Sequence, residues 1–257
     1  MRNKLTDELA VCGFNAATAL CEQHSETINR LFLREDRLKD FSRVCKILAE
    51  RKRPYKICED EELERICKSQ RHQGVVAMIE EPELVPLSRD DLGDWSRGRK
   101  TGLMLHSVGN DHNLGAIVRS AAFFDAGLVV LNETDTEARL TTSAYRVAEG
   151  GMEFTEFRTV RDTAAFLRSA ARSLVVIGTD VRARLRIRDL GAVFRDKADG
   201  KSPLSGAVLV LGNEETGLPQ DVKDACSVLV RIPGTGAIES LNVAQAATLF
   251  LHELYEM

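Results

Sequence analysis

The pattern of hydrophobic and polar positions predicts an α/β protein. Short apolar runs rich in β-branched residues alternate with segments whose apolar residues recur at helical spacing. The runs predict strands at 28–33, 55–58, 74–79, 102–106, 128–132, 173–177, 207–211 and 228–232, with extended chain at 154–160. Helical spacing predicts helices at 41–52, 61–68, 110–124, 141–149, 164–171 and 241–254, and 9–20 predicts a strand or turn followed by a helix. Such alternation is typical of a sheet covered by helices.

A change in composition divides the chain into two domains. Residues 81–100 hold two prolines, two glycines and many charges, which predicts a linker. We therefore expect a small α/β domain over 1–80 and a larger α/β domain over 101–257.

Composition narrows the class of protein. The chain has 257 residues, 44% of them hydrophobic and 29% charged, and no apolar run approaches the roughly 18 residues of a membrane span. The first residues, MRNKLTDELA, lack the apolar core of a signal peptide. The six cysteines include no C-x-x-C pair, so we expect reduced thiols, no metal site and a cytoplasmic protein.

Charge is unevenly distributed. The formal net charge is −4, so a nucleic-acid partner would require a local basic surface. Between Arg30 and Arg71 there are thirteen Lys or Arg against nine Asp or Glu. A second basic stretch carries Arg182, Arg184, Arg186 and Arg188 at period two, which in an extended segment would point one way. Each stretch fits either a solvated charged surface or a phosphate-contacting one.

Glycine-bearing loops follow several of the predicted strands. The strand at 207–211 stops on Gly212, and the strand at 228–232 leads into a loop with Gly234 and Gly236. A third loop is expected at Gly178. In open α/β sheets, ligands bind beyond the carboxyl ends of the strands, and glycine allows close approach to the backbone. Spacing alone fits either simple turns with a capped helix at Asn242 or a binding site.

Three segments resemble the motifs of the SpoU (TrmH-type) RNA 2'-O-ribose methyltransferases, which belong to the SPOUT superfamily. They are NLGAIVRSA from Asn113, GNEETGLP from Gly212 and IPGTGAIESLNVAQA from Ile232. At the N-terminus, CGFNAATAL, RLFL and RHQGVVAMI resemble the L30e-like substrate-binding domain that precedes many of these enzymes.

The resemblance implies a function and a site. It implies transfer of a methyl group from S-adenosylmethionine to a ribose 2'-hydroxyl of rRNA or tRNA, in a C-terminal domain with a mostly parallel sheet and a deep trefoil knot. It also implies a homodimer whose active sites are completed by the second subunit. The implied catalytic residues are Asn113, Arg119, Glu214, Ser240 and Asn242. The implied cofactor-binding residues are Thr179, Gly212, Asn213, Gly217, Ile232, Gly236, Ser240 and Leu241.

The role of Arg119 stays open at this point. The family makes it the candidate for activating the hydroxyl, but a guanidinium with a pKa above about 12 is a poor base. It could equally clamp a neighbouring phosphate.

Two other functions fit parts of the sequence. A knotted RNA-binding protein of weak catalysis, assisting RNA folding or ribosome assembly, is disfavoured because all five implied catalytic residues are present. A Rossmann-type nucleotide enzyme requires G-x-G-x-x-G after its first strand, and the spacing of Gly109 and Gly115 does not provide it.

Overall fold

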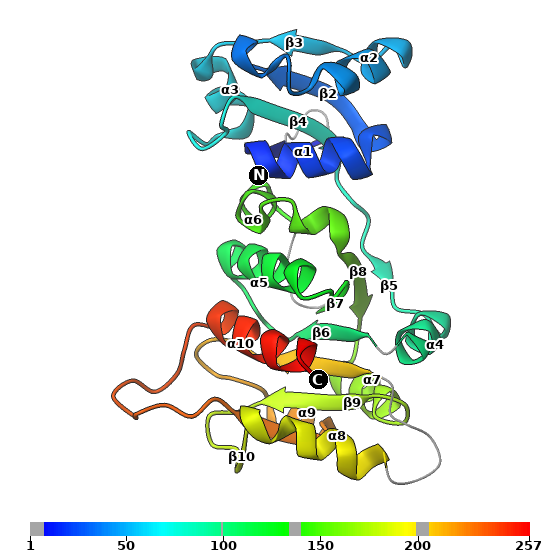
Figure 1. Cartoon of the computed structure of the whole chain (residues 1–257), viewed down its shortest axis with the longest axis vertical. Coiled ribbons are helices and arrows are strands. Elements are labelled where there is room, and N and C mark those ends of the chain that lie inside the picture. Colours follow the sequence, from blue (N-terminus) through cyan, green and yellow to red (C-terminus); the bar gives the residue numbers. More distant parts are fainter. Residues whose placement is uncertain (1–7, 99, 134–139, 199–205) are drawn as a thin grey trace. The chain divides into compact units, whose positions relative to one another are not determined.

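The structure, a computed structural model of the chain, describes residues 8–98, 100–133, 140–198 and 206–257. Contacts divide it into two compact units. Unit 1 comprises residues 1–83 and 139–154, and unit 2 comprises 84–138 and 155–257. Each unit has its own sheet, as the α/β pattern predicts (Figure 1).

Unit 1 is built on a four-stranded sheet of order β1-β4-β2-β3. β4 runs antiparallel to β1 and β2, whereas β2 and β3 are parallel. The strands are β1 (Glu8–Cys12), β2 (Ile28–Leu33), β3 (Tyr55–Ile57) and β4 (Val75–Glu80). The helices are α1 (Phe14–Gln23), α2 (Ser42–Glu50) and α3 (Asp60–Cys67), with 3-10 turns η1 (Ser25–Thr27) and η2 (Glu35–Arg37). The predicted elements of this region are confirmed to within a few residues.

A segment from the middle of the sequence completes unit 1. It contains α6 (Thr142–Ala148), which contacts β1, and η3 (Gly151–Phe154), which contacts α1. The Asn15 side-chain amide donates to Glu149 at 2.7 Å, and His24 Nδ1 lies 2.7 Å from Glu153 Oε2. From the sequence we expected this segment in the C-terminal domain. Its place in unit 1 could not be predicted, because contacts between residues more than a hundred positions apart leave no local pattern.

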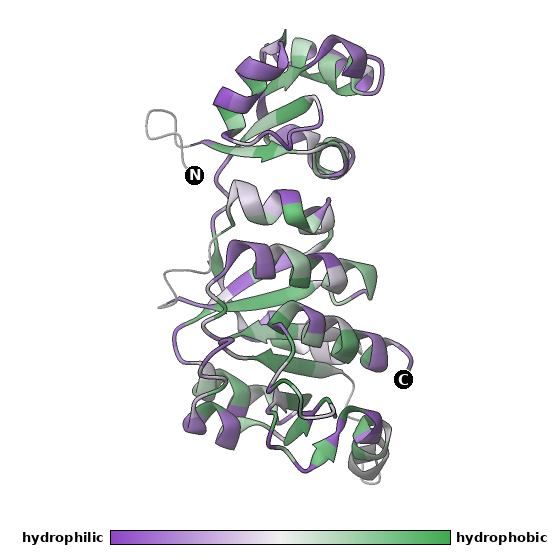
Figure 2. Cartoon of the chain, turned by 90° about the vertical axis from the view of Figure 1, so that its left-hand side faces the viewer, coloured by the Kyte–Doolittle hydropathy of each residue, from purple (hydrophilic) through white to green (hydrophobic). Residues whose placement is uncertain are grey.

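Unit 2 is built on an eight-stranded sheet of order β10-β12-β9-β11-β6-β7-β8-β5, and all of its pairings are parallel. Most strands are nearly continuous apolar runs, as expected where helices cover a parallel sheet (Figure 2). The strands are β5 (Val85–Pro86), β6 (Thr101–Leu105), β7 (Leu128–Asn132), β8 (Glu156–Val160), β9 (Val175–Thr179), β10 (Leu185–Arg186), β11 (Ala207–Leu211) and β12 (Val228–Arg231). The helices are α4 (Arg89–Arg97), α5 (Asp111–Phe123), α7 (Thr163–Ala170), α8 (Leu190–Ala198), α9 (Gln220–Ala225) and α10 (Val243–Tyr255), with η4 (Ile187–Asp189).

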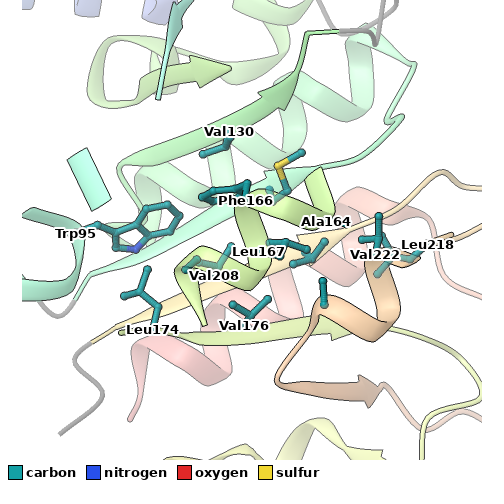
Figure 3. Close-up of a cluster of buried hydrophobic side chains, with 14 residues drawn as sticks. Trp95, Val130, Ala164, Phe166, Leu167, Leu174, Val176, Val208, Leu218 and Val222 are labelled. Carbon is teal, nitrogen blue, oxygen red and sulfur yellow. The ribbon is translucent and has the colours of Figure 1, made fainter. Parts of the chain in front are cut away.

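The predicted linker over 81–100 is wrong for most of its length. Residues 85–86 form β5, which pairs with β8, and α4 follows with a complete capping box at Ser88. Trp95 of α4 is 3% exposed, packs against Phe166 with ring centroids 6.5 Å apart, and belongs to the core cluster of unit 2 (Figure 3). Its indole nitrogen donates to the Lys100 carbonyl at 3.0 Å. Because α4 is mostly polar, its sequence did not indicate that the Trp95 side chain is buried in the core.

The basic stretch around Arg182 is also not one extended strand. Residues 185–186 form β10 and the next three residues form η4, so the period-two argument for a shared side-chain direction does not apply to the four arginines. β9 extends to Thr179, so Gly178 lies inside the strand and the loop begins later than predicted.

Two further findings concern the described residues. None of the helices there has the length and apolar character to cross a membrane. All six cysteines are free thiols.

We predict that Trp95→Ala lowers the free energy of unfolding by about 3–5 kcal/mol, the cost of removing a large buried aromatic side chain. The neighbouring backbone is built around this ring, since a Cβ at Gly102 would lie 2.2 Å from it. Urea denaturation measures the change. The matched control is Val85→Ala at a half-exposed strand position, for which we expect a change within about 0.5 kcal/mol. Equal effects would show that α4 is not part of the core.

Candidate active site

The candidate site lies at one edge of the sheet of unit 2. β12, β9, β11 and β6 are adjacent and parallel, so their carboxyl ends lie at the same edge. The loops leaving that edge begin after Leu105, Thr179, Leu211 and Arg231. This arrangement is the one in which open α/β sheets bind ligands.

Three of the predicted catalytic residues form a hydrogen-bonded chain at this edge. The Asn242 side-chain amide donates to Asn113 Oδ1 at 3.0 Å, and the Asn113 amide donates to the Glu214 carboxylate. Asn242 precedes α10, Asn113 lies in the first turn of α5, and Glu214 belongs to the loop after β11. Each side chain is half-buried or exposed, so the chain faces a surface that a ligand can reach.

The first turns of α5 and α10 are brought together by parallel packing. Besides the asparagine pair, Ser120 Oγ lies 2.7 Å from Thr248 Oγ1, and the rings of Phe124 and His252 meet edge to face at 5.9 Å. Asn110 caps α5 through the His112 amide, and Asn242 caps α10 through the Ala244 amide. Two helix N-termini therefore place partial positive charge beside the chain of polar side chains.

The loop after β11 is held in a tight turn. Asn213 donates to the Ser107 carbonyl at 3.0 Å, and its Oδ1 accepts from the amides of Glu215 and Thr216. A Cβ at Gly212 would lie 2.6 Å from the backbone of Gly217, which itself has a φ of 68°. Glycine is required at Gly212 because two backbone segments touch there.

The remaining predicted cofactor residues lie on two other segments. Thr179 ends β9 and donates its hydroxyl to the Val210 carbonyl at 3.1 Å. The chain between β12 and α10 forms an open loop (Figure 1), in which Gly236, Ser240 and Leu241 are exposed and Ile232 is half-buried. Across the part of the chain that the structure describes, no hydrogen bond joins Ser240 to the asparagine chain.

Arg119 stands apart from the three bonded residues. It is exposed on α5, six positions after Asn113, which places the two side chains about a third of a turn apart around the helix. Within the described ranges its guanidinium has no hydrogen-bond or ion-pair partner. The side chain is therefore available to a ligand.

The sequence did not reveal two supporting groups. Ser107 adopts a left-handed conformation with a φ of 56° and supplies the carbonyl that anchors Asn213. Asp180 pairs with Lys223 at 2.7 Å. Burial raises the pKa of the Asp180 carboxyl, but hydrogen bonds from Lys223 and the Arg182 amide outweigh burial and leave the pKa below its usual value. Of these two features, only the left-handed conformation of Ser107 could have been suspected, because the chain turns sharply from strand to loop there.

Several groups at this edge of the sheet suit the chemistry of S-adenosylmethionine. Positions 217 and 236 are glycines with open space on the side where a Cβ would lie, so an adenine or a ribose can approach the backbone closely there. The Gly217 amide itself is already used, because it donates to the Asn213 carbonyl at 2.9 Å. The two helix N-termini suit a carboxylate, and the Glu214 carboxylate suits a positively charged group.

Two sequence families match the chain. Residues 10–85 match the family described as RNA 2'-O ribose methyltransferase substrate binding, and residues 100–252 match the SpoU rRNA Methylase family. With the fold and the site, these matches define an RNA 2'-O-ribose methyltransferase that uses S-adenosylmethionine, as the motifs predicted. The chain belongs to the SpoU rRNA methylase family.

Curated relatives extend over nearly the whole chain. The 23S rRNA (guanosine-2'-O-)-methyltransferase RlmB of Ralstonia nicotianae is 34% identical over 94% of this chain and 92% of its own length. The enzyme of the same name from Nitrosomonas europaea is 30% identical over 98% of this chain and 92% of its own length.

Solved structures show the same fold. An AdoMet-bound rRNA methyltransferase from Sinorhizobium meliloti has a TM-score of 0.75 at 23% identity, covering 98% of this chain and 88% of its own. The SpoU methyltransferase AviRb from Streptomyces viridochromogenes, in complex with AdoMet, has a TM-score of 0.71 at 21% identity, with 98% and 91% covered. At these identities the likeness is one of fold.

We predict that Gly212→Ala weakens binding of S-adenosylhomocysteine at least tenfold, because the added methyl group collides with the Gly217 backbone and displaces the loop. Isothermal titration calorimetry measures the affinity. Gly93→Ala on α4, outside the loops of the site, is the matched control, since a Cβ there meets only the end of the flexible Arg97 side chain. We expect it to bind within threefold of the wild type, and an unchanged affinity for Gly212→Ala would contradict the site.

Proposed function

We propose that this protein methylates the 2'-oxygen of a guanosine in 23S rRNA. The hydrogen-bonded chain of Asn242, Asn113 and Glu214 carries the proposal, because it joins all three family motifs at one sheet edge. The near full-length similarity to guanosine-2'-O-methyltransferases supports the choice of RNA and nucleotide. Such a substrate places the protein in the cytoplasm.

The cofactor is held by the loops after β9, β11 and β12. We assign this role to Thr179, Gly212, Asn213, Gly217, Ile232, Gly236, Ser240 and Leu241. S-adenosylmethionine supplies a methyl group already activated on a sulfonium. The protein therefore has to hold the acceptor oxygen in line and assist departure of its proton.

Catalysis is assigned to Asn113, Arg119, Glu214, Ser240 and Asn242. The asparagine pair fixes the direction of the Glu214 carboxylate, because Asn113 uses its acceptor end on Asn242 and its donor end on Glu214. Arg119 approaches the acceptor, either lowering the cost of removing the hydroxyl proton or clamping the adjacent phosphate. Its guanidinium, which has no partner among the described residues, supports both roles.

The N-terminal unit contributes RNA affinity. Its basic stretch between Arg30 and Arg71 supports phosphate contact, although several of these arginines are already paired, such as Arg34 with Asp36 and Asp60. The logarithm of the RNA affinity should fall linearly with the logarithm of the salt concentration, with a slope proportional to the number of phosphates contacted. The exposed Arg182 and Arg184 form a second candidate contact surface in unit 2.

The active protein is a homodimer with a knotted C-terminal unit. α5 and α10 expose apolar side chains that a partner could cover, among them Phe123 at 79% exposure together with Leu249 and Tyr255. For the knot, the support is the strand order: β12 lies between β9 and β10, so the short connection between those two strands has to cross it.

We predict that Arg119→Ala abolishes methyl transfer while S-adenosylhomocysteine affinity stays within about twofold. The side chain is exposed and, among the described residues, unpaired, so its removal leaves the fold intact. Incorporation of labelled methyl groups into 23S rRNA, together with calorimetry, separates the two effects. Arg168→Ala, exposed on α7, is the control. A near-wild-type rate for Arg119→Ala would remove its catalytic role.

A dimer with composite sites predicts rescue between two inactive variants. Arg119→Ala retains a donor site, and Asn242→Ala retains an acceptor arginine. Co-expression should therefore restore a fraction of the activity in mixed dimers, each with one intact site. Sedimentation of the wild type provides the independent measurement. A fully active monomer would contradict the dimer.

The proposed reaction is tested by mapping 2'-O-methylation in 23S rRNA from cells with and without the gene. One guanosine should lose its methyl group on deletion and regain it with the wild-type protein. A 2'-O-methylation pattern of 23S rRNA that is unchanged by deletion of the gene would instead favour a protein that assists RNA folding without catalysis.

A further inference from the structure

Unit 1 contains a cavity of about 230 Å³ that the methyl-transfer site does not use. It is lined by Gly13, Ala16, Arg71, Gln73, Arg146 and Glu149. Four of these residues belong to the N-terminal fold, and Arg146 and Glu149 come from the α6 segment and its end. The cavity therefore joins residues from both family matches within one compact unit.

Two of the wall residues are arginines. Neither Arg71 nor Arg146 makes a side-chain hydrogen bond or ion pair among the described residues. Glu149 forms no ion pair with either arginine among the described residues, and its carboxylate accepts from the Asn15 amide at 2.7 Å. The ionised wall residues are two arginines and one glutamate, which leaves one net positive charge.

The shape of the wall is fixed by backbone and by a glycine. Gln73 is held by two hydrogen bonds: its Oε1 accepts from the Phe14 amide at 2.6 Å, and its carbonyl accepts from Arg37 at 3.1 Å. A Cβ at Gly13, which has a φ of 101°, would point at Gln73 Oε1 and Arg146 Cγ, at 3.6 Å and 3.9 Å. Position 13 favours glycine because of this positive φ, and the absence of a side chain leaves room beside Arg146.

We propose that this cavity binds a phosphodiester group of the RNA substrate, held between Arg71 and Arg146. A phosphodiester carries one negative charge, which matches the net charge of the wall, and arginine forks suit its paired oxygens. The proposal rests on the proposed function in that the ligand is RNA. It adds a defined binding site that includes a residue outside the N-terminal family match, Arg146.

The test compares Arg71→Gln/Arg146→Gln with Arg168→Gln/Arg172→Gln, which removes the same charge from exposed positions on and after α7 of unit 2. The probe is transcribed 23S rRNA, and filter binding is measured across a salt series. For the cavity variant we expect at least about tenfold weaker RNA binding. We also expect the slope of log K against log salt to become shallower by about 0.7–0.9 for each phosphate that the variant no longer neutralises. The control variant should keep both the affinity and the slope.

Calorimetry with S-adenosylhomocysteine should give the wild-type affinity for both variants, which separates this proposal from the methyl-transfer site. Weaker RNA binding with an unchanged slope would overturn the phosphodiester assignment, since recognition of a base has no salt signature. RNA affinity that is unchanged, with inorganic phosphate bound by wild type alone, would overturn it too and make the cavity a small-anion site. If the double variant melts early, Arg71→Gln alone decides the outcome, because this exposed side chain has no partner among the described residues. A wild-type protein that binds this RNA but never methylates it would contradict the proposed function and leave the cavity assignment standing.

Discussion

The candidate site depends on the parallel packing of α10 beside α5. Asn242 does two things at once: its Oδ1 caps α10, and its amide bonds Asn113 across the helix pair. The same register recurs at Ser120 with Thr248, where the two partners are separated by 128 residues in the sequence. Slipping α10 by one turn would move it about 5.4 Å and break the contacts of Asn242 with Asn113 and of Thr248 with Ser120. The start of the last helix is therefore fixed by the residue that completes the polar chain.

Strand order supplies the second half of the geometry. β11 lies between β6 and β9, so the loop carrying Glu214 leaves the sheet beside the loop that supplies Ser107. Asn213 bonds the Ser107 carbonyl and ties the two loops together, and the glycine contact at Gly212 closes the turn. Polar side chains of the chain's middle and end meet because the sheet places their strands as neighbours.

The local sequence pattern predicted the positions of helices and strands far better than it predicted which of them pack together. The strands at 28–33, 128–132 and 207–211 coincide with their predictions. The last two are buried strands of a parallel sheet, which are nearly continuous apolar runs in the sequence. α4 was missed because mostly charged and polar positions surround one buried indole, Trp95. The attachment of α6 to β1 could not be predicted, since a contact over that sequence distance has no periodic signature. For the site, residue identities came from the motifs, whereas the bonds of Asn113 to Glu214 and Asn242 came only from the fold.

The boundary between the two family matches is not the boundary between the two compact units. The segment 139–154 lies in the SpoU match yet packs in unit 1, so the polypeptide passes between the units at three places. The attachment is substantial: Ala148 and Met152 are buried, and the Glu153 side chain lies largely buried beside His24. Burial raises the pKa of the Glu153 carboxyl, while the hydrogen bond with His24 opposes that rise. Taking a carboxylate out of water costs free energy that apolar contacts of the same segment have to offset. A segment held in this way is an integral layer of unit 1, and it is covalently continuous with β7 and β8 of the catalytic sheet.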